Sequence, residues 1–164
     1  MKYTFAELKG VKDLDLGASQ WLTIEQKRID AFAEATDDHQ WIHTDPERAA
    51  KTPFGSTIAH GYLLLSMVPK LFNDMFLISD AAMLVNFGLD KVRFMKPVPS
   101  GSQIRMKAKI ESATVRKGNL LLRIRGFLML RPTDDDGEGR RAVVIDALFM
   151  AIPQSEAQDP EPES

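Results

Sequence analysis

The stretch IAHGYLLLSMVPKLFNDMF, residues 58–76, is the most apolar part of this chain and decides its fold. Its apolar side chains cover most of a helical circumference, which is typical of a helix buried on nearly all sides. Pro69 lies inside the run, and because proline breaks the helical hydrogen-bond pattern we expect a bend near Ser66. The sequence therefore predicts a central helix that the rest of the chain must cover.

Beyond residue 80 the apolar period changes to two, which is typical of strands. Apolar and charged side chains alternate most regularly over residues 104–111. Turn sequences rich in glycine, proline, asparagine and aspartate separate this segment from its neighbours. We expect four antiparallel strands, over residues 87–94, 104–111, 120–131 and 142–152.

Upstream of the central helix, residues 19–23 predict a short strand that runs into a helix ending at Thr36. Thr23 and Gln26 have the spacing of a capping box, which would start that helix. Residues 37–55 have no sustained period, apart from a helix start at Asp45-Pro46. An antiparallel sheet wrapped around one buried helix is an α+β architecture. We expect one domain over residues 1–152 and a disordered acidic tail over residues 153–164.

The amino-acid composition excludes several classes of function but does not identify one. A chain of 164 residues that is 44% apolar suits one domain with a real core. The absence of cysteine excludes disulfides, thiolate metal sites and a cysteine nucleophile. No signal-peptide core is present, and the apolar stretch at residues 62–68 is too short to span a bilayer. We expect a soluble cytoplasmic protein with no membrane partner.

The net charge of −2 hides a basic segment, because residues 91–131 contain 11 basic and 1 acidic side chains. Such a segment could bind a phosphorylated ligand or nucleic acid. The alternation over residues 104–111 instead favours the solvated outer face of a sheet. We expect no nucleic-acid partner.

The candidate site lies in residues 38–61, which contain all three histidines of the chain. Asp38 and His43 are five positions apart and would diverge by about 140° on a regular helix, so they converge only in an irregular segment. A carboxylate and an imidazole that converge can hold and activate one water. Gly61 follows His60 at a predicted helix start, where a backbone N–H can stabilise an oxyanion.

The block DHQWIHTDPERA at residues 38–49, followed by Phe54, Ile58, His60 and Gly61, resembles the signature of the MaoC-like (R)-specific enoyl-CoA hydratases. With FGLDKVRF at residues 87–94 and PVPSG at residues 97–101, it is especially similar to the branch named after nodulation protein N. The resemblance implies a hot-dog fold. It also implies hydration of a trans-2-enoyl-CoA to the (R)-3-hydroxyacyl-CoA, or the reverse, with no cofactor beyond the coenzyme A of the substrate.

The resemblance also implies the roles of individual residues. By position, Asp38 and His43 form the catalytic pair, and Gly61 supplies the oxyanion N–H. Gln40 stands in a supporting position where the wider family has asparagine. His60 supports the site from a helix start, where its ring can bond a carbonyl.

Two further positions depart from the family pattern. Asp37 stands where the family usually has glycine. A serine that supports the catalytic aspartate in some relatives aligns with Pro69, which leaves Ser66 as the nearby hydroxyl.

The resemblance to a coenzyme A enzyme assigns part of the basic segment to the substrate phosphates. The candidates are Lys91, Arg93, Lys96, Arg105 and Lys107, and those that do not bind coenzyme A are solvated strand faces. A single sheet on one helix also leaves an edge and an apolar face uncovered, so we expect a homodimer.

Three alternatives stay open at this point. His39 and His43 could bind zinc from one helix with Asp45 or His60, although we expect a metal-free site. A hot-dog acyl-CoA thioesterase would use the carboxylate to activate water against the thioester carbonyl. The third alternative is a non-catalytic subunit that binds an acyl thioester.

Overall fold

The computed structural model describes residues 1–132 and 139–154, and its main feature is a six-stranded antiparallel sheet. The strands of this sheet follow the order β2-β6-β7-β8-β5, and β3 also pairs with β6. Its strands are β2 (Lys12–Ala18), β3 (Leu22–Thr23), β5 (Ala81–Phe94), β6 (Gln103–Arg116), β7 (Asn119–Leu130) and β8 (Arg140–Pro153). The short strands β1 (Lys2–Tyr3) and β4 (Leu77–Ile78) form a separate parallel pair.

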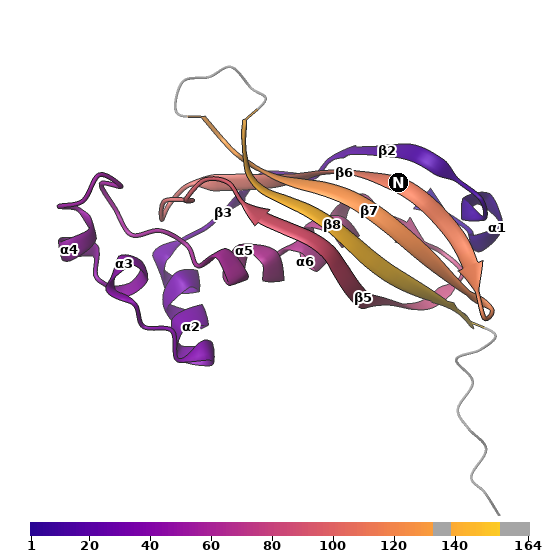
Figure 1. The fold of residues 1–164 in the computed structure, drawn as a ribbon, viewed down its shortest axis with the longest axis horizontal. Helices are drawn as coiled ribbons and strands as arrows, with labels where there is room; N and C mark the ends of the chain where they lie inside the picture. Colours follow the sequence, from indigo (N-terminus) through magenta and orange to yellow (C-terminus); the bar gives the residue numbers. More distant parts are fainter. Residues whose placement is uncertain (133–138, 155–164) are drawn as a thin grey trace, which may run out of the picture.

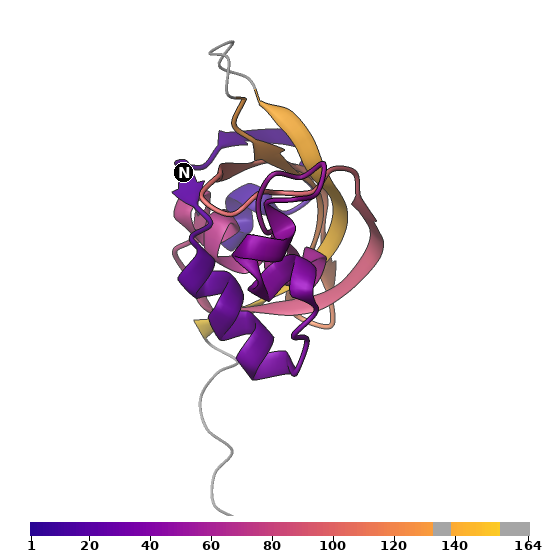
Figure 2. The ribbon, with the colours of Figure 1, turned by 90° about the vertical axis from the view of Figure 1, so that its left-hand side faces the viewer.

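The sheet curls around two consecutive helices, three further helices gather at one end of the molecule, and α1 lies at the other end (Figures 1 and 2). The helices are α1 (Phe5–Leu8), α2 (Gln26–Thr36), α3 (Trp41–Thr44), α4 (Pro46–Ala49), α5 (Gly61–Ser66) and α6 (Val68–Met75). The four predicted strands are confirmed as β5 to β8, and the α+β hot-dog architecture is confirmed with them. The sheet is wider than expected because β2 and β3 both add to the edge of β6.

The central helix is present and is interrupted where the sequence predicts a bend. α5 ends at Ser66 and α6 begins at Val68, with Met67 between them. Pro69 lies in the first turn of α6, where a missing N–H leaves no helical acceptor unpaired. The two helices bury one apolar face against the sheet, and Phe72 stacks on Phe149 of β8 with 4.9 Å between ring centroids. The helix begins at Gly61, as predicted from the His60-Gly61 pair, and so three residues after the start of the apolar run.

The predicted capping box at the start of α2 is wrong. Thr23 lies in β3 and pairs with Gln103 of β6, so its backbone is held extended by the sheet. The helix therefore starts later, after Glu25, whose side chain makes no capping bond. α2 ends at Thr36, as expected, and Asp37 after it has φ +57°, in the left-handed region that glycine adopts most easily.

Residues 37–55 form two single-turn helices and irregular turns in place of a continuous helix. The helix start at Asp45-Pro46 is confirmed, because Pro46 begins α4 and Asp45 Oδ1 accepts the Arg48 N–H at 3.0 Å. α3 precedes it and contains His43. This interrupted path is the irregular segment that the site requires.

The end of the chain lies mostly outside the described residues, so the expected tail stays a prediction. Pro153, counted with the tail above, ends β8 and pairs with Ala81. In the part of the chain that the structure describes, no helix is long and apolar enough to cross a membrane.

Candidate active site

The candidate site lies where α2, α3 and α4 meet the beginning of α5 (Figure 2). Asp38 follows the end of α2, His43 lies in α3, and His60 immediately precedes α5. One potential ligand atom from each of these three side chains lies within 4.8 Å of the other two. The left-handed turn at Asp37 redirects the chain after α2, which lets Asp38 and His43 approach each other.

His43 is buried, with 7% of its surface exposed, and its ring is anchored at one nitrogen. Nδ1 lies 2.6 Å from the carbonyl oxygen of Ile58. A carbonyl only accepts, so Nδ1 carries the hydrogen and a neutral ring has its lone pair on Nε2. Burial lowers the pKa of His43 below its ordinary value, although the Ile58 carbonyl opposes this. At neutral pH the ring is therefore a neutral base with Nε2 able to accept a proton.

His60 forms the buried floor of the site. It is 2% exposed, and its ring stacks on His43 with 3.8 Å between centroids and 27° between planes. Phe32 of α2 contacts the same ring at a centroid distance of 5.0 Å. The Nε2–H donates to the backbone carbonyl of Asp38 at 3.0 Å, so this histidine holds the backbone that carries the Asp38 carboxylate.

The Asp38 carboxylate is exposed to solvent, in contrast to the buried ring of His43. Its side chain is 54% exposed, and Oδ2 lies 4.0 Å from Nε2 of His60. A carboxylate with this exposure stays hydrated, and a water between it and His43 could bond both groups. The exposed Asp38 carboxylate and Nε2 of the buried His43 are therefore two proton acceptors that could bond the same water.

Gly61 is the first residue of α5, where backbone N–H groups have no acceptor within the helix. A Cβ at this position would lie 3.1 Å from three ring atoms of Phe94, which is tighter than ordinary contact. A cavity of about 280 Å³ joins Gly61 to His43, and Phe94 and Lys96 contribute to its wall. Gly61 and His43 thus line one cavity, and Asp38 is not among the residues that line it.

Asp38, His43 and His60 are the described residues whose donor atoms lie close enough together to hold a metal ion, but the geometry of the two histidines is unfavourable for tetrahedral coordination. Nδ1 of His43 and Nε2 of His60 already bond carbonyl oxygens, and the in-plane lone pairs of two stacked rings run side by side. The zinc interpretation through His39 also finds no geometric support. His39 is exposed with its Nδ1 3.6 Å from Glu34 Oε1, and it is not among the described residues whose donor atoms cluster. A metal-free site stays a prediction.

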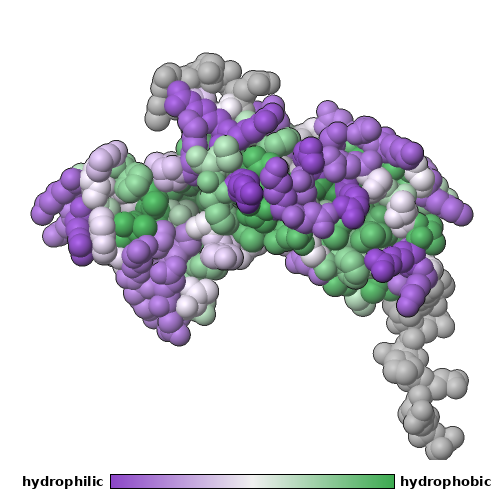
Figure 3. Space-filling model, in the orientation of Figure 1, coloured by the Kyte–Doolittle hydropathy of each residue, from purple (hydrophilic) through white to green (hydrophobic). Residues whose placement is uncertain are grey.

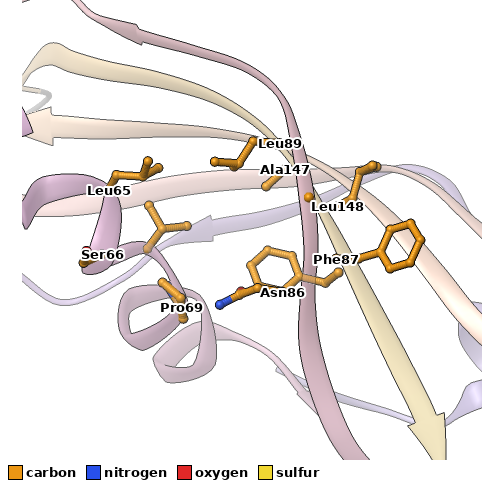
Figure 4. Close-up of a pocket in the computed structure, with 11 residues that line it drawn as sticks. Leu65, Ser66, Pro69, Asn86, Phe87, Leu89, Ala147 and Leu148 are labelled. Carbon is orange, nitrogen blue, oxygen red and sulfur yellow. The ribbon is translucent and has the colours of Figure 1, made fainter. Parts of the chain in front are cut away.

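Two residues expected to support the site have different surroundings. Gln40 precedes α3, and its backbone carbonyl accepts the N–H of His43 at 2.9 Å, while the residue itself is exposed. Ser66 donates to the Tyr62 carbonyl at 2.8 Å and lines a second cavity of about 500 Å³ between the central helices and strands β5 and β8 (Figure 4). Neither Asp38 nor His43 lines that cavity, so the expected link between Ser66 and these two residues has no contact behind it.

The five basic candidates fall into separate places. Lys96 lines the cavity of the site. Lys91 and Arg93 are exposed on β5. Arg105 and Lys107 lie on the face of β6 opposite the core, and the Arg105 guanidinium lies 4.4 Å from the ring centroid of Trp21. Only Lys96 of the five therefore lines the cavity that holds His43 and Gly61.

Sequence reasoning missed two residues that contact the site, Gln26 and Thr57. Gln26 Nε2 donates to the backbone carbonyl of His43 at 2.7 Å. The Thr57 hydroxyl donates to Gln26 Oε1. Neither residue carries a charge or a titratable group that would single it out, and the spacing of Gln26 to Thr23 pointed to a helix cap instead.

Residues 10–122 match the family described as MaoC like domain. Among curated relatives, 3-hydroxyacyl-thioester dehydratase Z of Mycobacterium tuberculosis (strain ATCC 25618 / H37Rv) is 47% identical over 105 residues, covering 64% of this chain and 70% of that protein. Nodulation protein N of Rhizobium leguminosarum bv. viciae is 47% identical over 110 residues, covering 66% of this chain and 68% of that protein.

Among solved structures, the R-hydratase PhaJ1 from Pseudomonas aeruginosa in its unliganded form superposes with a TM-score of 0.67 at 21% identity. The superposition covers 98% of this chain and 95% of that chain. At this identity the likeness shows the fold alone.

Proposed function

Because the chain belongs to the MaoC-like dehydratase family and is a hydro-lyase, we propose that it adds water reversibly to a trans-2-enoyl-CoA to give the (R)-3-hydroxyacyl-CoA. The observation that carries this proposal is the cavity shared by His43 and the Gly61 N–H, with Asp38 beside it. Family membership alone would not specify which groups act. The cavity supports His43 and the Gly61 N–H as candidates, and the short distance between Asp38 and His43 supports them as a pair, although Asp38 is not among the residues that line the cavity.

The proposed reaction starts with a water between the Asp38 carboxylate and Nε2 of His43. The water oxygen bonds to C3 of the enoyl group as one O–H bond breaks and its proton passes to the pair. C2 takes a proton from the same pair, so the sum is addition of one water across the double bond. Negative charge that develops on the thioester oxygen meets the Gly61 N–H, and a donor of this kind lowers a barrier by about 3 kcal/mol.

The second cavity suits the acyl chain of the substrate. Leu65 and Val68 line it from the central helices and Leu89 from β5, which makes its wall largely apolar (Figure 4). Leu65 lies four residues after Gly61, or about 6 Å along a helix. An acyl chain that starts at the oxyanion donor and runs along α5 would reach this cavity. Each methylene buried there would favour binding by about 0.8 kcal/mol, or about fourfold.

A homodimer through β5 is part of the same proposal. β5 ends the sheet, so its outer edge has no strand partner among the described residues. Five large apolar side chains on it are between 40% and 50% exposed, namely Met83, Val85, Phe87, Leu89 and Phe94. Apolar surface gathers in this region (Figure 3). Light scattering tests the dimer directly, and a monomer at micromolar concentration would contradict it. A cytoplasmic location stays a prediction.

The deciding experiment incubates the purified protein with trans-2-enoyl-CoAs of increasing chain length and separates the products on a chiral column. We expect (R)-3-hydroxyacyl-CoA, with kcat/KM rising as the chain lengthens. Release of free thiol without hydration would identify a thioesterase instead. Tight binding of acyl-CoA with no product would identify a non-catalytic subunit.

A further inference from the structure

We propose that Gln26 is a positioning residue that, together with Thr57, fixes the orientation and the tautomer of His43. The inference rests on the proposed function for its kinetic consequence. The contacts that carry it are independent of any substrate. They form a closed ring of hydrogen bonds that joins α2, α3 and the segment before α5.

The first contact supplies a hydrogen-bond donor to a carbonyl of the short helix α3. This helix has four residues, and the last carbonyl groups of any helix lack an N–H partner within the helix. The carbonyl of His43 receives the Gln26 Nε2–H at 2.7 Å, which fixes the peptide plane next to the His43 Cα. α2, an eleven-residue helix, thereby holds the backbone from which the imidazole projects.

The second contact holds the group that anchors the ring. Thr57 is 2% exposed, and its hydroxyl donates to Gln26 Oε1. The next residue, Ile58, supplies the carbonyl that accepts Nδ1–H of His43 at 2.6 Å. Gln26 therefore bonds both the backbone of His43 and the neighbour of its ring acceptor, so the ring and its acceptor cannot move independently.

The chemistry of this position is specific for a primary amide. Besides the bond to His43, Gln26 Nε2 donates to Oδ1 of Asp30 at 2.8 Å. Both amide hydrogens thus face acceptor oxygens, and the amide oxygen faces a hydroxyl donor. Glutamate would place an oxygen against a carbonyl and a carboxylate. Methionine has a similar length and would make none of these bonds.

The consequence lies in which nitrogen of His43 carries the hydrogen. While the Ile58 carbonyl stays in place, Nδ1 is protonated and Nε2 keeps its lone pair, which in the proposed reaction accepts a proton from water. If the ring of hydrogen bonds opens, the carbonyl and the imidazole separate and the other tautomer becomes accessible. A misplacement of about 1 Å at a reacting group costs about 100-fold in rate.

The test compares Gln26→Met and Thr57→Val with Thr57→Ser, which keeps the hydroxyl and serves as the matched control. Nitrogen-15 NMR of the imidazoles reads the tautomer of His43 without substrate, and the chain has only 3 histidines to assign. We expect Nδ1–H to predominate in the wild type and in Thr57→Ser, and both tautomers to be populated in the other two variants. kcat should fall about 10- to 100-fold in those two with KM changed less than about threefold, and the double variant should be little worse than Gln26→Met.

The proposal is overturned if Gln26→Met or Thr57→Val folds and keeps the wild-type tautomer and kcat. It is also overturned if kcat falls together with the melting temperature while the tautomer stays unchanged, because Gln26 would then be structural only. If Gln26→Met does not fold, the proposal is tested by comparing the His43 tautomer and kcat of Thr57→Val with those of Thr57→Ser. A wild type without hydratase activity would refute the proposed function, whereas the NMR comparison would still test the role of Gln26.

Discussion

Replacing His43 by asparagine or by glutamine separates the proton-transfer role of the ring from its structural role. The amide nitrogen of asparagine lies about where Nδ1 of histidine lies, so His43→Asn can keep the bond to the Ile58 carbonyl. The amide nitrogen of glutamine lies nearer to the Nε2 position, so His43→Gln leaves that carbonyl without its donor. Neither amide can take up or release a proton at neutral pH.

The two variants should therefore lose activity alike and differ in stability. Loss of general acid–base help costs about 100- to 10,000-fold in kcat, and Asp38→Asn should show a loss in the same range. The carbonyl left unpaired in His43→Gln adds about 1–3 kcal/mol of destabilisation. Each 1 kcal/mol lowers Tm by about 2–4 °C in a domain of this size, so His43→Gln should melt below His43→Asn.

The assay follows loss of the conjugated enoyl-thioester absorbance, and circular dichroism on the same samples gives Tm. Equal Tm values for the two variants would mean that the Ile58 contact contributes nothing to stability. A folded His43→Asn or Asp38→Asn protein that kept more than a tenth of the wild-type kcat would refute the assignment of the pair.

Four further results are expected. Asp37 has φ +57°, so Asp37→Gly should raise the free energy of unfolding by about 0.5–1 kcal/mol and raise Tm with it. Asp37→Ala should lower Tm. The reverse order of the two Tm values would contradict the strain argument. Because the pKa of buried His43 lies below its ordinary 6.5, the unfolded chain binds a proton first as pH falls, so the free energy of unfolding should decrease below pH 6.5 until the folded pKa is passed. Urea titrations at a series of pH values should show this slope weakened in His43→Asn. Lys96→Glu, in the cavity wall, should raise KM for acyl-CoA in a salt-dependent way with little change in kcat, whereas Arg105→Glu on the opposite face of the sheet should leave KM unchanged. Activity should survive a chelator, and stoichiometric zinc by elemental analysis together with loss of activity on chelation would overturn the metal-free prediction.

Local patterns of the sequence determined the elements of the fold. The alternation over residues 104–111 predicted β6 because a strand with one buried face needs apolar side chains at every second position. The run at residues 58–76 predicted the central helix, and Pro69 predicted its interruption, because proline acts within its own turn. The start of α4 at Asp45-Pro46 was equally local.

The candidate site was only partly readable in the sequence. Residues 38–61 contain Asp38, His43, His60 and Gly61 in an order that resembles a known family, and the structure brings these residues together. Their convergence depends on the left-handed turn at Asp37 and on a one-turn helix, and no sequence period encodes either. The second cavity, with Ser66 on its wall, needed the packing of α5 and α6 against β5 and β8.

By itself, then, the sequence determined which segments form the main strands and helices, because periodicity and residue type act over a few neighbouring positions, and its resemblance to a family singled out the candidate site residues. Tertiary structure alone decided that Thr23 joins a strand and that Gln26 bonds His43, since a strand partner 80 positions away outcompetes a local cap. It also decided that His60 stacks on His43 and that Arg105 lies far from the core face. Those relations arise from how the sheet closes around the helices, and a chain read one segment at a time does not contain them.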